Sequence, residues 1–388
     1  MIKTYKIKLK PNNKQKTKML QFCGAKRFAY NWALNKQKEN YKNGGKFISD
    51  CELRKEFTQL KKTEEYKWLY SINNDVTKQA IKDCCLAYKR FFSGIGKKPK
   101  FKSKKTDKPS FYVDNVKIKF TNDKVKLGNI ATSKKNNKAK LNWIRLSEKN
   151  KIPTDCKYIN PHVVYDGIDW FICVGIEFEE SIESPTNKGI GIDLGIKDLA
   201  ICSDKIIYKN INKARKIKKL EKRKRRLQRS ISRKYLNGKK GGRYYKTSNI
   251  IKSEKKLLKL NHRLTNIRND YLHKVTSKII NRKPKFITIE DLNVSGMMKN
   301  KHLSKAIQQQ KLYEFRRQLE YKCKWNNIEL RIVDRYYPSS KLCHNCGQIK
   351  SDLKLSDRIY KCDCGYEEDR DYNASLNLRD SKIYKILQ

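Results

Sequence analysis

The sequence predicts an α+β protein built from several domains. Its 388 residues suffice for two or three domains of roughly 100–200 residues each. In the first half of the chain, stretches with alternating apolar residues, typical of strands, flank a long region with apolar residues at helical spacing. The second half alternates short apolar strands with helices, which is the pattern of an α/β domain with a partly parallel sheet.

The charge of the chain indicates a polyanionic partner. There are 92 Lys and Arg residues against 39 Asp and Glu residues, a net charge of +53. Nucleic acid is the polyanion that we expect to neutralise this charge. No apolar run reaches the roughly 18 residues of a membrane span, and residues 1–8 alternate instead of forming a secretory signal. We therefore expect a cytoplasmic, nucleoid-associated protein with reduced cysteines and no membrane partner.

The first half predicts a small antiparallel sheet or barrel that carries a helical insertion. Residues 1–10 alternate as a strand does, and residues 107–186 return to this alternation. The pair Asp166-Gly167 is typical of a β-hairpin turn. Residues 11–106 hold helices, which we expect to pack a core of their own, followed by a basic linker.

The second half predicts an α/β domain with a long basic pair of helices. Apolar strands end at Asp193 and Glu290, and one helix around residues 306–321 followed by another strand completes a βαβ unit. Residues 213–263 hold 22 Lys or Arg residues and two acidic ones. We expect two antiparallel helices joined by a glycine turn at residues 237–242, with an apolar seam and basic faces that contact nucleic acid. The candidate contacts on these faces are Arg223, Arg225, Arg226 and Arg229.

Three carboxylates stand where a metal site could form. Asp193 and Glu290 end two apolar strands, and Asp371 lies at the start of a predicted terminal helix. Carboxylates at the ends of adjacent strands converge on one edge of a sheet, where cations must offset their repulsion. Mg²⁺ or Mn²⁺ suits such oxygen ligands, and two ions can activate water for phosphodiester cleavage. A single Asp after a strand is more often a turn former or a helix cap, but the three together favour a metal site.

Four cysteines predict a structural zinc site. Cys343 and Cys346 form a C-x₂-C pair, and Cys362 and Cys364 form a second pair that is one residue shorter than usual. A glycine follows each pair, as a tight knuckle turn requires. The short second pair leaves open that His344 replaces one thiolate. With all four positions closed, the zinc ion would have no open position for catalysis.

Several segments of the chain resemble one known family. The C-terminal segments are GIDLG at 191–195, IEDL at 289–292, SSKLC at 339–343 and DRDYNA at 369–374. The N-terminal segments are residues 26–32, 87–92 and 99–102. In order, spacing and total length the chain is similar to TnpB proteins, the OrfB-type proteins of bacterial insertion sequences and relatives of type V CRISPR effectors. The resemblance covers nearly the whole chain.

The resemblance implies a RuvC-like nuclease domain of the RNase H fold, interrupted by a zinc knuckle and preceded by a wedge-like β-barrel with a helical recognition insertion. It implies the following boundaries: barrel 1–10 and 107–186, recognition module and linker 11–106, nuclease 187–340 and 367–388 with a basic helical hairpin at 207–282, and zinc module 341–366.

By matched position, the resemblance makes Asp193, Glu290 and Asp371 the catalytic residues that bind Mg²⁺. Asp371 is preferred to Asp369 because the family places its acid two residues before an Asn-Ala pair. The implied partners are a guide RNA from the transposon end and double-stranded DNA that carries a short element-adjacent motif. Lys78 and Gln79, predicted to be exposed on the second N-terminal helix, are candidate contacts to that motif.

Other functions remain open on the sequence. A miniature type V CRISPR effector of the same fold would differ in genomic context and not in visible chemistry. A binding module would use RNA to occupy DNA without cutting it. A guide-free transposase or a DNA-binding accessory protein would act on element ends without RNA.

Overall fold

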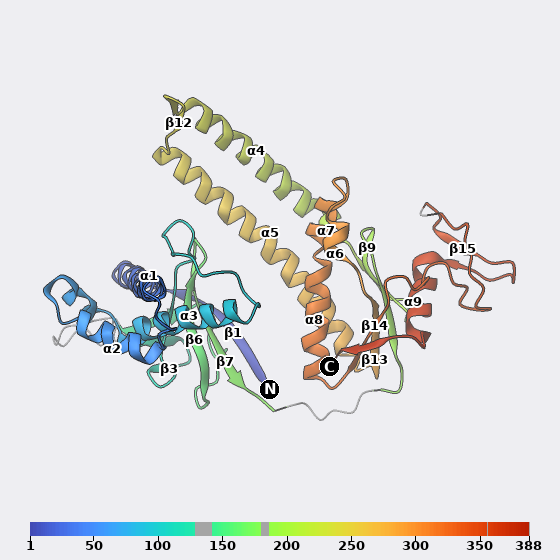
Figure 1. The fold of residues 1–388 in the computed structure, drawn as a ribbon. Helices are drawn as coiled ribbons and strands as arrows, with labels where there is room; N and C mark the ends of the chain where they lie inside the picture. Colours follow the sequence, from blue (N-terminus) through green and yellow to red (C-terminus); the bar gives the residue numbers. More distant parts are fainter. Residues whose placement is uncertain (129–141, 180–185, 355, 388) are drawn as a thin grey trace. The chain divides into compact units, whose positions relative to one another are not determined.

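The protein forms two compact units, Met1–Glu179 and Glu180–Gln388 (Figure 1). The structure is a computed structural model that describes residues 1–128, 142–179, 186–354 and 356–387. Among the described residues, no helix combines the length and the apolar composition that a membrane span requires.

The first unit contains a seven-stranded antiparallel sheet in the order β2-β6-β7-β1-β5-β4-β3. Its strands are β1 (Ile2–Lys10), β2 (Ser110–Tyr112), β3 (Ile118–Phe120), β4 (Lys124–Leu127), β5 (Trp143–Leu146), β6 (Tyr158–Tyr165) and β7 (Trp170–Glu177). The predicted hairpin turn is confirmed, since Gly167 has a φ of 94° and the Asp166 carboxylate accepts the N–H groups of Ile168 and Asp169. In the described part of the chain β2 and β3 do not pair with each other, so the sheet is a half-barrel.

The helices of the first unit share one hydrophobic core with this sheet. They lie in the chain between β1 and β2: α1 (Asn13–Lys42), α2 (Asp50–Leu60), the 3₁₀ segment η1 (Glu64–Ser71) and α3 (Asn74–Phe92). Phe22 of α1 meets Phe111 of β2 edge to face, with ring centroids 5.3 Å apart. The expectation of a separate helical core is therefore wrong, because the apolar face of the open sheet needs these helices to exclude water.

The second unit is an α/β fold around a six-stranded sheet in the order β10-β9-β8-β13-β14-β17. Its strands are β8 (Ile190–Leu194), β9 (Asp198–Cys202), β10 (Ile207–Lys209), β13 (Phe286–Glu290), β14 (Glu329–Val333) and β17 (Lys385–Leu387). The expected partly parallel sheet is confirmed, because β8, β13 and β14 are parallel neighbours. The exposed edge strand β17 was not predicted, since it follows the terminal helix without an apolar pattern of its own.

The two faces of this sheet carry different helices. Ile190, Ile192, Ile287 and Ile289 pack in one cluster with apolar residues of α5 (Ser248–Ile280) and α8 (Leu312–Trp325). The alternate residues point to the other face, where the C-terminal helix α9 (Arg370–Asp380) packs on β8, β9 and β13.

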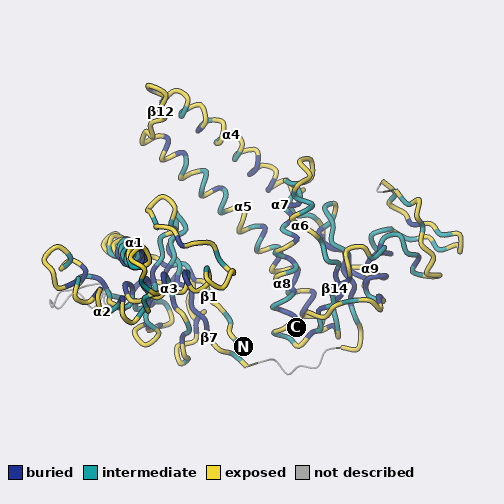
Figure 2. Tube along the Cα trace, in the orientation of Figure 1, coloured by how far each residue is buried: buried dark blue, intermediate teal, exposed yellow. Residues whose placement is uncertain are grey.

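The predicted basic pair of helices is confirmed as α4 (Arg215–Asn237) and α5. Ile217 and Leu220 of α4 pack against Leu260 and Leu264 of α5, which forms the apolar seam. Gly241 and Gly242 both have positive φ, and they join the short strands β11 (Lys239–Lys240) and β12 (Arg243–Tyr244) at the tip. Figure 2 shows exposed residues at intervals along both helices, between intermediate and buried ones. The helices are joined to β10 by the 3₁₀ turn η3 (Ile211–Lys213).

The single helix expected around residues 306–321 is in fact two helices, α7 (Ser304–Gln310) and α8, after the short α6 (Val294–Met297). Lys311 separates them with a left-handed φ of 58°. The buried Gln310 side chain donates hydrogen bonds to the carbonyl oxygens of Gly195 and Asp198, at 3.0 and 3.3 Å. These tertiary hydrogen bonds fix the end of α7, which apolar periodicity alone does not reveal.

Candidate metal centres and nucleic-acid surface

A glycine on β8 brings helix α9 against the sheet beside Asp193. A Cβ atom at Gly191 would lie 2.0 Å from the Ser375 carbonyl oxygen and 2.5 Å from the Arg379 nitrogen, so only glycine permits this packing. Asp193 lies two residues further along β8 on the same face, about 6.6 Å away. Asp371 lies four residues before Ser375 on α9, about 6.0 Å along the helix axis. The two carboxylates are thus at similar distances from this contact, and the charge of Asp371 acts on Asp193.

Glu290 is the third carboxylate on this face. Ile289 of β13 is paired with Ile192 of β8, so Glu290 and Asp193 are the next residues of two parallel strands. Ile289 points to the α5 and α8 face, and Glu290 consequently points to the α9 face. Both strands end here, which places the carboxylates at the carboxyl edge of the sheet.

The environment of the three carboxylates disfavours charge on two of them. Burial, together with the charges of Asp371 and Glu290, raises the pKa of Asp193 to about 7. Burial raises the pKa of Glu290 to about 7. Within the described residues, the three carboxylates are not gathered as closely as the cysteine ligands below. A divalent cation bound here would supply the positive charge that stabilises the ionised carboxylates, and it would replace their protons.

An arginine that sequence reasoning missed lies in this cluster. Arg370 donates to the Asp371 carboxylate from Nε at 3.1 Å and from Nη2 at 2.9 Å, and its charge acts to lower the pKa of Asp193. Arg358 lies further away, with Nη1 3.9 Å from the second Asp371 oxygen. Asp369 has a different task, because its carboxylate accepts the backbone N–H groups of Asp371 and Tyr372 and so caps α9.

We expect Gly191→Ala to displace α9 and destabilise the second unit. The added Cβ meets backbone atoms that cannot rotate away, and such overpacking costs about 1–3 kcal/mol or more. Thermal unfolding should show a lowered Tm. Gly24→Ala is the control, because its nearest neighbour is the flexible Arg27 side chain at 3.9 Å. An unchanged Tm for Gly191→Ala would contradict the close packing.

We expect Asp193→Asn to stabilise the protein at pH 8 without added Mg²⁺. The pKa values of Asp193 and Glu290 rise from their ordinary 3.8 and 4.5 to about 7 on folding. The folded state then binds more protons than the unfolded state between about pH 4 and 7, so stability falls as the pH rises through this range. The variant should gain about 1–2 kcal/mol above pH 7 and little near pH 4. Parallel curves of Tm against pH for both proteins would contradict this.

The four cysteines form one cluster whose geometry could hold a metal ion. The sulfur atoms of Cys343 and Cys364 are 3.7 Å apart, those of Cys346 and Cys362 are 3.6 Å apart, and all four lie within 4.8 Å of one another. Four sulfurs at about 2.3 Å from a tetrahedral zinc ion are separated by about 3.8 Å, so the cluster fits this ion. The Tyr366 N–H and the Asn345 amide lower the pKa of the Cys364 thiol to about 6, which favours the thiolate that binds metal.

Each pair of cysteines is bent by a glycine turn. Gly347 and Gly365 have φ values of 75° and 85°, and their N–H groups donate to the carbonyl oxygens of Cys343 and Cys362. The short strands β15 (Ile359–Lys361) and β16 (Glu367–Asp369) support the second turn. The one-residue shortening of the second pair is therefore accommodated, and all four cysteines are gathered.

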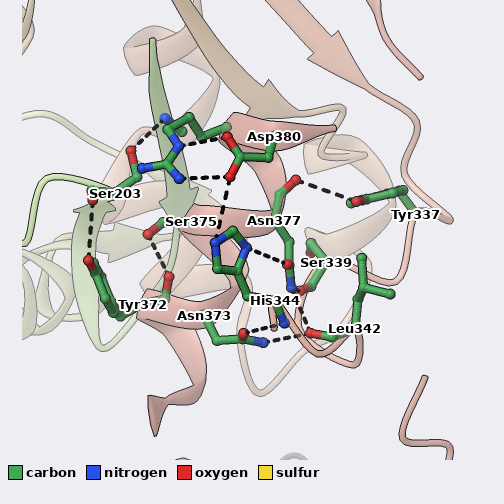
Figure 3. Close-up of polar contacts among 12 residues, drawn as sticks. Ser203, Tyr337, Ser339, Leu342, His344, Tyr372, Asn373, Ser375, Asn377 and Asp380 are labelled. Carbon is green, nitrogen blue, oxygen red and sulfur yellow. Dashed lines mark hydrogen bonds and ion pairs between the residues drawn. The ribbon is translucent and has the colours of Figure 1, made fainter. Parts of the chain in front are cut away.

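His344 does not replace a thiolate. Its ring nitrogens face α9, with Nε2 3.6 Å from Asp380 Oδ2 and Nδ1 3.3 Å from Asn377 Oδ1 (Figure 3). This alternative from the sequence is wrong, because the His344 ring packs against α9 while the sulfurs of Cys343 and Cys346 lie with those of Cys362 and Cys364.

Two buried asparagines of α9 hold the entrance to the knuckle, and we call them the asparagine clamp. The side-chain amides of Asn373 and Asn377 both donate to the Leu342 carbonyl oxygen, at 2.8 and 2.7 Å. Asn377 also donates to the Ser339 carbonyl oxygen at 2.8 Å (Figure 3). Their i,i+4 spacing could have indicated a shared helix face, but not which loop they hold. The clamp ties the knuckle to the helix that carries Asp371.

The basic hairpin presents two cation-lined grooves. All four candidate arginines are exposed, but they do not share one groove. Cations along the first groove are Arg223, Arg226, Lys256, Lys259 and Arg263. Cations along the second are Lys218, Lys222, Arg225, Arg226, Arg229 and Lys305. A backbone of regularly spaced phosphates suits such rows of cations.

The two candidate residues on α3, Lys78 and Gln79, differ in exposure. Lys78 is exposed, as expected. Gln79 is partly buried, and its amide donates to the Asp83 carboxylate at 2.8 Å, so the expectation that it is exposed is wrong. The i,i+4 pair with Asp83 on the same helix explains the difference.

Family models match three regions of the chain. Residues 171–301 match a family described as a probable transposase, OrfB_IS605, and residues 313–378 match the Cas12f1-like TNB domain. Residues 1–46 match a model described as a helix-turn-helix domain of OrfB_IS605. Over these last residues the structure has the strand β1 and the single helix α1, so this region does not form a helix-turn-helix.

Curated relatives extend over nearly the whole chain. InsQ of Escherichia coli K12, named as a candidate RNA-guided DNA endonuclease, is 30% identical over 394 residues, covering 97% of this chain and 91% of InsQ. A Streptomyces pristinaespiralis protein of the same description is 29% identical, covering 97% of this chain and 88% of the relative. Cas12f1 of Sulfoacidibacillus thermotolerans, a CRISPR-associated endodeoxyribonuclease, is 27% identical, covering 56% of this chain and 51% of Cas12f1.

A solved structure shares the fold. Cas12f1 in a cryo-EM complex with sgRNA and target DNA has a TM-score of 0.58 at 15% identity, covering 96% of this chain and 83% of that chain. This likeness agrees with the expected multidomain α+β fold, in which an α/β unit with a four-cysteine knuckle follows a sheet, although that sheet is a half-barrel and not the expected barrel. With the near-complete coverage of InsQ, these findings assign the chain: it belongs to the TnpB/OrfB family of transposon-encoded proteins.

Proposed function

We propose that this protein is an RNA-guided DNA endonuclease of the TnpB type. It binds a guide RNA derived from the transposon end and cleaves double-stranded DNA next to a short element-adjacent motif. The observation that carries the proposal is the convergence of Asp193, Glu290 and Asp371 on one face of a sheet, within a chain of net charge +53. The names of its relatives, which describe RNA-guided DNA endonucleases, support the same activity.

Asp193, Glu290 and Asp371 would hold two Mg²⁺ or Mn²⁺ ions. Bound there, these ions would activate water and stabilise the leaving oxygen of a phosphodiester. The carboxylates supply the oxygen ligands, and burial at the sheet edge keeps bulk water from screening their charge. Arg370 orients the Asp371 carboxylate by donating to one of its oxygens, and the other oxygen, 3.9 Å from Arg358 Nη1, would bind a metal ion.

The basic hairpin would hold RNA or a guide–target duplex through its phosphates. A protein that reads its target by base pairing needs backbone contacts of this kind and few base-specific ones. Lys78, exposed on α3, remains a candidate for the adjacent-motif DNA, whereas Gln79 would first have to leave Asp83. The domain boundaries implied by the family resemblance are part of this proposal.

We expect one structural zinc ion per chain, bound by Cys343, Cys346, Cys362 and Cys364. Metal analysis of the purified protein should give a zinc-to-protein ratio near one. Cys346→Ser should lose the ion and lower the Tm, because zinc binding contributes folding free energy. Cys51→Ser, an exposed cysteine outside the cluster, is the control. A full zinc content in Cys346→Ser would contradict the assignment.

The test of the proposed function is to sequence the RNA that co-purifies with the protein from cells that carry its native locus. A single abundant RNA that extends past the element end would supply the guide, and DNA matching that guide should then be cut in Mg²⁺. A neighbouring repeat array that encodes the guide would instead identify a CRISPR effector. Bound RNA without cleavage would favour a binding module. Bulk cellular RNA alone, with cleavage of element ends, would favour a guide-free transposase.

A further inference from the structure

We propose that Tyr336 is a stacking platform for an unpaired nucleobase of the strand that enters the carboxylate site. This inference rests on the proposed function and names a substrate contact for it. Tyr336 is 86% exposed, the largest fraction among the large apolar and aromatic side chains that the structure describes as exposed. An aromatic ring in water at a nucleic-acid site is suited to stacking on a base of a single strand.

The position of Tyr336 follows from the parallel strands. Val333, the last residue of β14, is paired with Glu290, the last residue of β13, and its carbonyl oxygen accepts the Asp291 N–H at 2.9 Å. Neighbouring strands lie about 4.8 Å apart. The chain therefore leaves β14 beside Glu290, and Tyr336 lies only three residues beyond this point. Its loop stands at the same edge of the sheet as the carboxylates.

Hydrogen bonds hold this loop in place on both sides of Tyr336. The Asp334 carboxylate accepts the Tyr336 N–H at 2.9 Å, and the Asp334 carbonyl oxygen accepts the Tyr337 N–H at 3.1 Å. Arg335 donates to the Asp291 carboxylate at 3.0 Å, which ties the loop to the residue after Glu290. Tyr337 turns inward, and its hydroxyl donates to the Asn377 carbonyl oxygen. A loop held in this way loses little conformational entropy when a base stacks on Tyr336.

The chemistry of the neighbourhood selects a single strand as the partner. The half-exposed Arg335 offers positive charge to a phosphate next to the stacked base. Bases inside a duplex already stack on one another, so an isolated ring can receive only an unpaired base. Stacking also tolerates any base, which suits an enzyme whose target is chosen by guide pairing.

The test uses the protein with its co-purified RNA and compares Tyr336→Leu, which lacks a ring, with Tyr336→Phe, which keeps it. In a Glu290→Gln background that blocks cleavage, a single-stranded oligodeoxynucleotide containing 2-aminopurine reports stacking by fluorescence quenching. We expect Tyr336→Leu to lose this quenching and Tyr336→Phe to keep it. With Glu290 intact, Tyr336→Leu should raise the KM for target DNA roughly 5- to 100-fold with little change in kcat. The Tm should stay unchanged in both variants.

Tyr41→Leu is the matched control, because Tyr41 is 78% exposed but lies on α1 in the first unit. It should retain quenching and KM. Equal quenching and KM for Tyr336→Leu and the unsubstituted protein would overturn the inference. Failure of the proposed function would look different, since the unsubstituted protein would then leave guide-matched DNA uncut whatever stands at position 336.

Discussion

Asp371→Ala should abolish DNA cleavage while the protein keeps its RNA. The carboxylate lies on the α9 face with Asp193 and Glu290, and it raises the pKa of Asp193 through its charge. Loss of a ligand from a two-metal centre removes stabilisation of the transition state and not of the bound substrate. We expect cleavage to fall by about 10³-fold or more, as it should for Asp193→Ala and Glu290→Ala. Cleavage of guide-matched DNA and RNA retention on the purified protein are the two measurements.

Asp369→Ala is the matched control for this prediction. Asp369 lies two residues before Asp371, carries the same side chain and caps α9 instead of facing Asp193. Loss of the cap should cost about 1 kcal/mol of stability and leave most of the cleavage rate. Full loss of cleavage in Asp369→Ala, with activity retained in Asp371→Ala, would reverse the assignment of the third carboxylate.

The second large effect is expected on the basic hairpin. Replacing Arg223, Arg225, Arg226 and Arg229 with glutamine removes four exposed cations from the two grooves. Each phosphate that is no longer neutralised should reduce the slope of log affinity against log salt by about 0.7–0.9, so the slope should fall by about 3. RNA affinity at 0.15 M salt should drop by about 10²- to 10³-fold. Titrations of the guide RNA at several salt concentrations measure both quantities.

A variant of equal charge provides the comparison. Glutamine at Lys97, Lys98, Lys104 and Lys105 also removes four exposed cations, but from the segment after α3. If affinity depended on net charge alone, the two variants would bind equally weakly. We expect the hairpin variant to bind at least tenfold more weakly than this control, because its cations line grooves and act on neighbouring phosphates together.

Much of the fold could be predicted because local patterns decided it. Strands β8 and β13, the α4–α5 pair and the Gly167 turn follow from apolar periodicity and glycine placement. The break at Lys311 could not be predicted, because it depends on hydrogen bonds from Gln310 to a distant loop. The shared core of the first unit was missed for the same reason, since periodicity shows that a helix has an apolar face but not what covers it.

The candidate site also combines residues that local sequence patterns predict with residues that only tertiary contacts reveal. Motif positions predicted the carboxylates and the four cysteines, and the structure places the cysteines in one group. The residues around them depend on tertiary contacts: Arg370 beside Asp371, Gly191 under α9, and the asparagine clamp. His344 illustrates the limit, because its place beside Cys343 suggested a zinc ligand and only the fold shows that its ring turns to α9.

The asparagine clamp bears on how a protein of this kind can lose its activity during evolution. Asn373 and Asn377 hold the knuckle entrance without help from the Asp371 side chain. A change of Asp371 to asparagine, reachable by one nucleotide substitution, would remove a repulsive charge from the sheet edge, weaken the contact with Arg370 and leave the clamp intact. The knuckle would then stay attached to α9 in a lineage that no longer cuts but still carries its RNA to DNA. Descendants selected for binding to DNA instead of cleaving it could arise by this one substitution, with the rest of the chain unchanged.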